Sequence, residues 1–229
     1  MYCPVHEKTK LMASNTSGIN TDIKINGQNL ETDTSFEYLG SVITGKPEIL
    51  SRIAQTTAAL TRLKPVWNDR SISLSSKIRP MRFLVTSIFL CACESWTLTV
   101  ELQRRIQAME MKCYRKVLRI SYKDHVTNEE VRAKIQQAIG PHEDLLTLVK
   151  RGKLQWYGHV SRSSGLVKTT LQGTVKGGRR QSRQKKRWKD SIGEWTGLEF
   201  AKSQRAVENR TNGGNWLRNY LWCPNDPRG

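Results

Sequence analysis

Long apolar runs are missing from this sequence of 229 residues. The longest uncharged apolar stretch, Phe83–Cys93, is far shorter than the roughly 20 residues that a membrane-spanning helix needs. The N-terminal residues also lack the apolar segment of a secretory signal. We therefore expect a chain that neither spans a membrane nor is secreted.

Cysteine is present at an odd number of positions and without a repeating spacing. The five residues are Cys3, Cys91, Cys93, Cys113 and Cys223. This pattern excludes a secreted disulfide framework and favours a reducing, intracellular compartment. The cysteines and histidines do not reproduce a C-x₂-C or H-x₃₋₅-H spacing, so we predict no zinc site and no cofactor.

Negative charge is scarce, because 20 Asp and Glu stand against 38 Lys and Arg, giving a net charge of +18 and a pI near 10.0. Residues 1–50 hold four cations and six acids, so the remaining 179 residues carry a net charge of +20. An ordinary solvated surface would balance its cations with Asp and Glu. We therefore predict RNA and DNA as partners, and neither a membrane nor a small-molecule substrate.

The hydrophobic pattern predicts an α+β fold that is predominantly helical. Alternation over Asp22–Ile43 predicts a small β-hairpin around Asn26–Gly27 and a further strand. Helical spacing then predicts helices over residues 47–65, 73–93, 102–120, 127–135 and 143–160, with a kink or restart at Pro80. A capping box, Thr127 with Glu130, marks the start of the fourth helix.

The expected domains follow these changes in pattern. Residues 1–45 form the β element, 46–160 a helical bundle, 161–187 a flexible basic arm, and 188–229 a short tryptophan-containing helix and tail.

Cations and aromatic residues suited to nucleic acid occur in the third helix and around the basic arm. Residues 151–190 hold twelve Lys and Arg and one acid. Neutralising phosphates releases counterions, and interleaved aromatic rings stack on unpaired bases. The predicted nucleic-acid-binding residues are Arg104, Arg105, Lys112, Arg115, Arg119, Trp156, His159, Arg179, Arg180, Arg183, Lys185, Lys186, Arg187 and Trp188.

Other roles for the same residues remain open. The basic cluster 179–187 also fits a nuclear-import signal, which predicts a nuclear and otherwise a cytoplasmic location. His159 fits a packed position beside Trp156 equally well. We expect Trp67, Trp96 and Trp195 to anchor cores.

Acidic pairs that would hold catalytic metal ions are not indicated. Two-metal nucleotidyl transfer needs several converging carboxylates. Glu129 and Glu130 instead belong to a capping box, and Glu143 and Asp144 to the first turn of a helix, where the helix dipole favours negative charge. We predict no catalytic and no metal-binding residue.

Several short motifs together carry a resemblance to a family. Phe36–Ile43 has the sequence FEYLGSVI, and Glu7–Met12 has EKTKLM. Further motifs are RIA at 52–54, WNDRSISL at 67–74, CESWTL at 93–98, RIQAMEM at 105–111, TNEEV at 127–131, WYGHV at 156–160 and RWKD at 187–190. Taken in their order along the chain, these motifs resemble the reverse transcriptases of non-LTR retrotransposons, especially RTE-like and jockey-like elements.

The resemblance implies the end of the palm, the thumb and the basic tail of an RNA-directed DNA polymerase. It makes Tyr38, Leu39 and Gly40 primer-grip positions. The family's Tyr-x-Asp-Asp motif and earlier metal-binding aspartate precede the EKTK stretch, where this chain has Met1–His6. We therefore expect binding of template RNA or primer duplex without catalysis, with Mg²⁺ only in the complete polymerase.

Two alternatives stay open. The first is a domesticated or relic retroelement fragment, acting as a non-enzymatic nuclear interaction protein or having no selected function. The second is a sequence-specific DNA-binding factor that uses the third helix for recognition.

Overall fold

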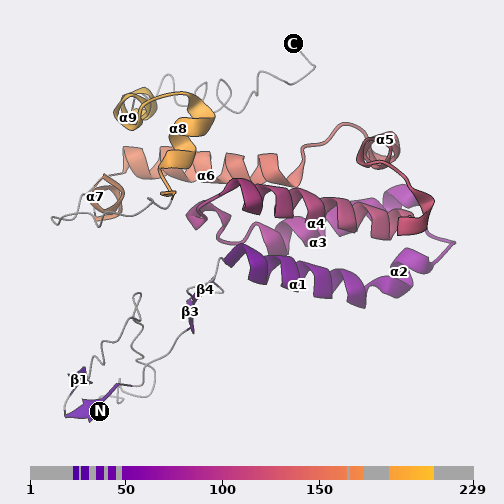
Figure 1. The fold of residues 1–229 in the computed structure, drawn as a ribbon, viewed down its shortest axis with the longest axis horizontal. Helices are drawn as coiled ribbons and strands as arrows, with labels where there is room; N and C mark the ends of the chain where they lie inside the picture. The colour runs from indigo at the N-terminus through magenta and orange to yellow at the C-terminus, as the bar shows by residue number, and fades with distance from the viewer. Residues whose placement is uncertain are drawn as a thin grey trace.

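The computed structural model describes residues 23–25, 27–30, 35–38, 41–44, 48–163, 166–172 and 186–208. Most of these residues are helical (Figure 1), which confirms the predicted predominance of helix. The helices are α1 Glu48–Arg62, α2 Lys64–Asn68, α3 Leu74–Phe89, α4 Val100–Leu118, α5 Asn128–Ile139, α6 Leu145–Arg162, α7 Leu166–Gln172, α8 Asp190–Thr196 and α9 Phe200–Glu208. None of these described helices is both long and apolar enough to cross a membrane.

Strands contribute little to the described structure. Lys24–Ile25 (β1) pairs antiparallel with Gln28–Asn29 (β2), and Gly27 between them has a φ of +81°. Ser35–Tyr38 (β3) pairs antiparallel with Ser41–Thr44 (β4). The expectation of one further strand over 36–43 was therefore wrong, because the chain reverses within it. Two-stranded pairs of this length lack the neighbouring strands that stabilise a sheet.

Side-chain caps set the helix boundaries. Ser73 Oγ accepts a hydrogen bond from Ser76 N, Thr99 Oγ1 from Leu102 N, and Asp144 Oδ1 from Thr147 N. Each cap satisfies an amide that the first helical turn leaves without a partner. Thr127 Oγ1 likewise accepts from Glu130 N, which is one of the two hydrogen bonds of the predicted capping box.

Pro80 lies inside α3 without interrupting it. The predicted restart at this residue was therefore wrong, and the helix ends at Phe89 rather than at Cys93, which begins the 3₁₀ turn Cys93–Ser95 (η2). Pro80 and Ser76 are both exposed. Proline has no N–H to donate to the Ser76 carbonyl, and this carbonyl can accept a hydrogen bond from water instead.

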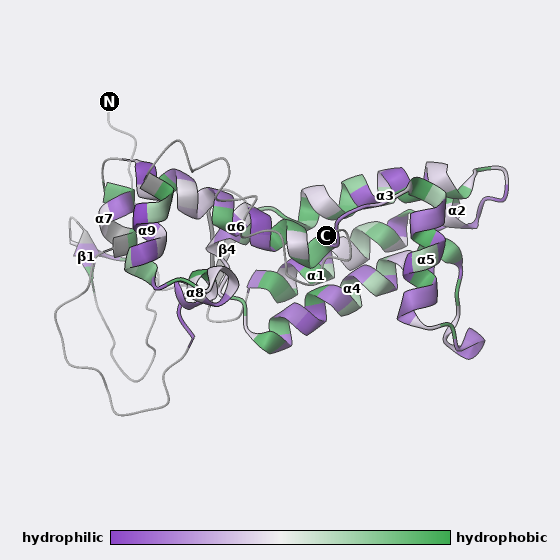
Figure 2. Ribbon diagram, turned by 90° about the horizontal axis from the view of Figure 1, so that it is seen from above, coloured by the Kyte–Doolittle hydropathy of each residue, from purple (hydrophilic) through white to green (hydrophobic). Residues whose placement is uncertain are grey.

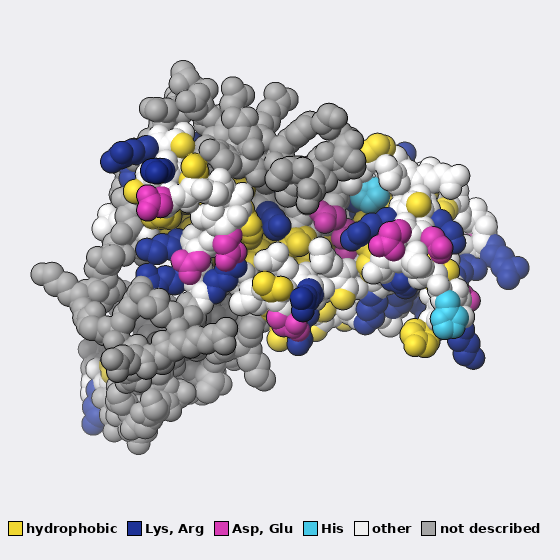
Figure 3. Space-filling view, turned by 45° about the horizontal axis from the view of Figure 1, so that its top comes forward, with side chains coloured by type: hydrophobic (Ala, Val, Ile, Leu, Met, Phe, Trp, Pro, Cys, Tyr) yellow, Lys and Arg dark blue, Asp and Glu magenta, His cyan; other side chains and the backbone are white. Residues whose placement is uncertain are grey.

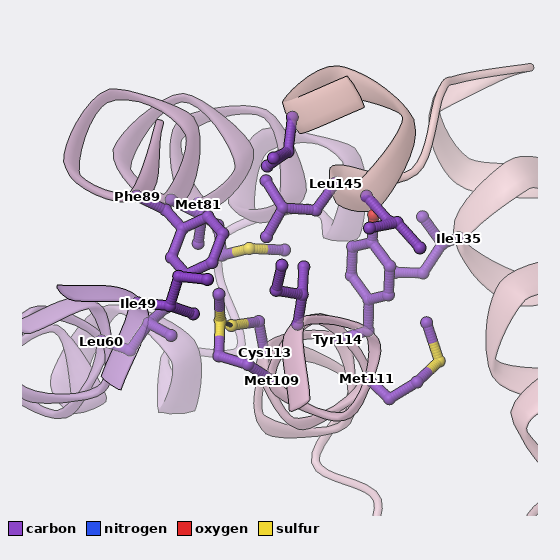
Figure 4. Packing of buried hydrophobic residues seen from close by; sticks show 14 of the residues in the cluster. Ile49, Leu60, Met81, Phe89, Met109, Met111, Cys113, Tyr114, Ile135 and Leu145 are labelled. Carbon is purple, nitrogen blue, oxygen red and sulfur yellow. Dashed lines mark hydrogen bonds between the residues drawn. The ribbon is translucent and has the colours of Figure 1, made fainter. Parts of the chain in front are cut away.

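The main core lies between α1, α3, α4, α5 and α6. Hydrophobic stripes on these helices turn toward one another (Figure 2), and Figure 4 shows their side chains interlocking. Ile78 and Phe89 of α3, Ile106 of α4, Ile135 of α5 and Val149 of α6 have no exposed surface. Leu102, Ile106, Met109, Cys113 and Val117, which recur at helical spacing in the sequence, are all buried on α4.

A second, smaller core joins the C-terminal helices to the end of α6. Leu154 and Tyr157 of α6 pack against Ile192 of α8 and Val207 of α9. Two of these helices contradict the predicted segments, because α7 lies inside the supposed arm and α9 inside the supposed tail. Leu171 of α7 packs against this core, and this contact holds α7 against the C-terminal helices.

Candidate nucleic-acid interface

Helix ends meet at one end of the main bundle. Lys116 Nζ near the end of α4 donates to Thr61 Oγ1 near the end of α1, at 2.8 Å. Arg119 Nε, at the C-cap of α4, donates to Trp67 O of α2 at 3.0 Å. Lys77 Nζ of α3 donates to the same carbonyl at 3.2 Å and also to Asp69 O.

We call this region, residues 61–74 and 115–125, the cationic end. It holds seven cations and two carboxylates, namely Arg62, Lys64, Arg70, Arg115, Lys116, Arg119 and Lys123 against Asp69 and Asp124. Figure 3 shows Lys and Arg side chains gathered at the end of the bundle away from α8 and α9.

Both carboxylates of the cationic end are bonded to neighbouring backbone. Asp69 Oδ1 accepts from Ser71 Oγ at 2.7 Å and from Ser71 N at 2.8 Å, and these bonds lower the pKa of Asp69. Asp124 Oδ2 accepts from Ser121 N at 2.6 Å. The acids therefore hold turns together and do not form ion pairs with the exposed cations of this end within the described residues.

The cations divide into two groups. Lys116 and Arg119 bond across helices as described, and Arg115 bonds to Asn128 Oδ1 at 2.8 Å and to Val126 O at 3.0 Å. The second group comprises Arg62, Lys64, Arg70 and Lys123, whose exposed side chains make no hydrogen bond or ion pair within the described part of the chain. Cations near helix C-termini stabilise the helix dipole, but the second group can also meet phosphate.

Tyr122 adds an aromatic ring to the cationic end that the sequence reasoning missed. It is 93% exposed, in the turn Tyr122–Asp124 (η3), and its ring lies 6.2 Å from that of His125. An exposed aromatic beside cations suits stacking on an unpaired base. The sequence indicated this exposure, because Tyr122 stands beside Lys123 and outside any apolar helical repeat that would bury its ring.

The cations predicted on α4 do not form one patch. Arg104, Arg105 and Lys112 are exposed, and Arg105 Nε pairs with Glu101 Oε1 at 2.8 Å. Arg105 and Arg119 are separated by about 21 Å along a helix axis. Arg115 and Arg119 therefore belong to the cationic end, whereas Arg104 and Arg105 lie toward the opposite end of α4.

The predicted stacking residues Trp156 and Trp188 contact each other. Their ring centroids are 5.3 Å apart in an edge-to-face arrangement, and Trp188 Nε1 donates to Glu94 O at 2.6 Å. Both side chains are partly exposed. The contacts favour a packing role, and stacking on bases stays a prediction. Of the tryptophans expected in cores, Trp67 and Trp96 are buried and Trp195 is partly buried.

Lys153 of α6 is fully buried under these rings. Its Nζ donates to Trp96 O at 2.9 Å and lies 4.5 Å from the Trp188 ring centroid and 5.3 Å from that of Trp195. Burial, and then repulsion from Lys186, lower the pKa of Lys153 to about 7. This cation therefore belongs to the core and is not available to phosphate.

The remaining predicted cations lie in or beside the arm. Arg179, Arg180, Arg183 and Lys185 fall outside the described residues. Lys186 Nζ pairs with Glu194 Oε2 at 2.5 Å, and Arg187 is exposed.

His159 of α6 is exposed rather than packed. Of the primer-grip positions that the resemblance implies, Tyr38 ends β3, while Leu39 and Gly40 fall outside the described residues. In the part of the chain that the structure describes, no three His, Cys, Asp or Glu residues lie close enough together to hold a metal ion.

A buried polar network on the other side of α4 was also missed. Arg82 Nη1 donates to Tyr114 Oη at 3.0 Å, and Tyr114 Oη donates to Glu110 Oε1 at 3.0 Å. Leu145 N donates to the same Glu110 oxygen at 3.0 Å, and His142 Nε2 lies 3.4 Å from Tyr114 Oη. Burial raises the pKa of Glu110, opposed by the bonds from Leu145 and Tyr114.

No family model, curated protein or solved structure matches this chain.

Proposed function

We propose that this chain binds nucleic acid through phosphate contacts at the cationic end, and that it does so as the thumb and tail part of a non-LTR retrotransposon reverse transcriptase. The observation that carries the first half is the charge balance of the cationic end. Four exposed cations, Arg62, Lys64, Arg70 and Lys123, lie there without an acidic partner in the described residues. Like charges collected without counter-charges repel one another, and a polyanion relieves this repulsion.

The second half depends on the ordered motifs of the sequence. The bundle supports it only by being helical, as a thumb requires. The proposed partner is template RNA or the primer duplex, and the polymerase carboxylates belong to the segment that precedes EKTK in the family. The isolated chain then binds without extending a primer, and primer extension on an RNA template would overturn this part.

Salt dependence of binding tests the phosphate contacts. Affinity for an RNA duplex is measured by fluorescence anisotropy over a range of KCl concentrations. Each phosphate contact adds about 0.9 to the slope of log affinity against log salt on duplex and about 0.7 on a single strand. On the duplex, the triple variant Arg62→Ala, Arg70→Ala, Lys123→Ala should lower the magnitude of this slope by about 2.7.

A matched control separates the cationic end from net charge alone. Arg162→Ala, Lys202→Ala, Arg205→Ala removes three exposed cations from the opposite end of the molecule. Its slope should remain close to that of the unaltered chain. Equal losses in the two variants would show that binding has no preferred surface and would overturn the proposal.

A further inference from the structure

A pocket of about 300 Å³ lies between α4, α5 and the loop that leads into α6. Glu110 and Tyr114 of α4 form its inner wall, and Arg132 and Gln136 of α5 lie at its mouth with His142. The lining therefore combines the buried carboxylate of Glu110 with more exposed polar groups, among them the carboxylate of Asp144.

Glu110 is the unusual member of this lining. Only 5% of its surface is exposed, and its Oε1 already accepts two hydrogen bonds. Its Oε2 is buried and has no hydrogen-bond partner within the described residues. Buried carboxylate oxygens nearly always have a donor, and the described residues supply none to this one.

The other walls suit a flat ring attached to a phosphate. Pro141 and the half-buried ring of His142 are flat faces, and the His142 ring packs edge-to-face with Tyr114 at 6.1 Å. Arg132 is exposed at the mouth, where its guanidinium can bond to a phosphate. Proteins recognise unpaired bases by this combination of flat faces and hydrogen bonds to the base edge.

We propose that this pocket binds an unpaired nucleobase that carries an exocyclic amino group, with the amino group donating to Glu110. A carboxylate accepts from the amino group of cytosine, whereas the carbonyl at the same position of uracil offers another acceptor. The inference rests on the proposed function, since the base belongs to the bound strand.

Paired oligonucleotides of equal backbone charge test the pocket. We expect the chain to bind oligo(C) of about 12 nucleotides at least fivefold more tightly than oligo(U) at equal salt and about pH 8. Glu110→Gln places an amide donor beside the base and should reduce this preference to near unity without weakening oligo(U) binding. Glu129→Gln, the same change on the exposed first turn of α5, should keep the preference.

A second variant covers the case in which a change at buried Glu110 disturbs folding. Gln136→Trp fills the mouth of the pocket from an exposed position and should also remove the preference. Gln137→Trp is the matched control, because exposed Gln137 lines a different groove with Leu74 and Leu118.

The outcomes distinguish the two proposals. Equal binding of oligo(C) and oligo(U) by the unaltered chain, with a steep salt dependence, would overturn the base pocket and leave the phosphate surface standing. A preference that survives Gln136→Trp would also overturn it. Failure to bind oligo(C), oligo(U) and the RNA duplex alike would overturn the proposed function and the pocket together.

Discussion

Replacing Lys153 with methionine should stabilise the protein at neutral pH. The side chain is fully buried, and its pKa falls from 10.5 to about 7, chiefly because burial penalises the charged amine. A pKa shift of that size means that burying the amine of Lys153 lowers the stability of the folded state at neutral pH by about 5 kcal/mol, relative to an uncharged side chain. Methionine removes this cost but leaves Trp96 O without its donor, which costs about 1–3 kcal/mol. The free energy of unfolding at pH 7 should therefore rise by roughly 2–4 kcal/mol.

The pH dependence of the free energy of unfolding tests the cost of burying Lys153 independently. Below pH 7 Lys153 is protonated in both states, whereas between pH 7 and 10.5 the unfolded chain binds more protons than the folded chain. Stability therefore increases with pH across this window, by roughly 2 kcal/mol from pH 7 to pH 8.5. The buried thiols of Cys93 and Cys113, whose pKa burial raises to about 12, oppose this trend only as pH rises past their unfolded value of 9.0.

Urea unfolding followed by tryptophan fluorescence at pH 7 and pH 8.5 measures both effects. The unaltered chain should gain stability between the two pH values, and Lys153→Met should remove that gain. Lys202→Met, at an exposed position of α9, is the control and should change neither value. A methionine variant that is less stable at pH 7, or that keeps the pH dependence, would refute the reasoning.

Further variants test the core and the helix contacts. Ile106→Ala, at a position with no exposed surface, should lower the free energy of unfolding by about 2–5 kcal/mol in urea denaturation, whereas Phe83→Ala, at a side chain that is 75% exposed, should change it little. A small effect at Ile106 would mean that the main core is wrongly assigned. Gly158→Ala should stabilise α6 by up to about 1 kcal/mol, because an added Cβ meets chiefly the flexible Arg162 side chain. Gly152→Ala should gain less in the same assay, since its Cβ would lie 3.3 Å from Cys93 Sγ; equal gains would contradict the close packing of α6 on η2.

Periodicity predicted the helices that bury one continuous face. Ile106, Met109, Cys113 and Val117 follow the 3.6-residue repeat of α4, and all four are buried. The weaker helices α7 and α9 escaped prediction because their burial depends on contacts with α6 and α8. Val207, for example, is buried by residues that lie about 50 positions earlier in the chain.

Polar residues in cores were the main failure of the sequence reasoning. Glu and Lys usually lie at the surface, so the residue types of Glu110 and Lys153 give no indication that they are buried. Glu110 is buried because the start of α6 supplies Leu145 N, and Lys153 because Trp188 and Trp195 cover it. Those partners are 35 or more residues away in the sequence, beyond the range of any local pattern.

Structural and phosphate-binding roles can be separated at the cationic end. Arg119 donates a hydrogen bond to Trp67 O, and Lys116 donates one to Thr61. Replacing either residue should therefore loosen the junction of α1, α2 and α4 and weaken nucleic-acid binding through misfolding. Arg70 and Lys123 have no such bond in the described residues, so their replacement should weaken nucleic-acid binding at unchanged stability. If cations gathered here only to satisfy helix C-termini, the exposed pair would be dispensable for both properties. Affinity and unfolding measured on the Arg70→Ala, Lys123→Ala variant therefore decide between a capping surface and a phosphate-binding one.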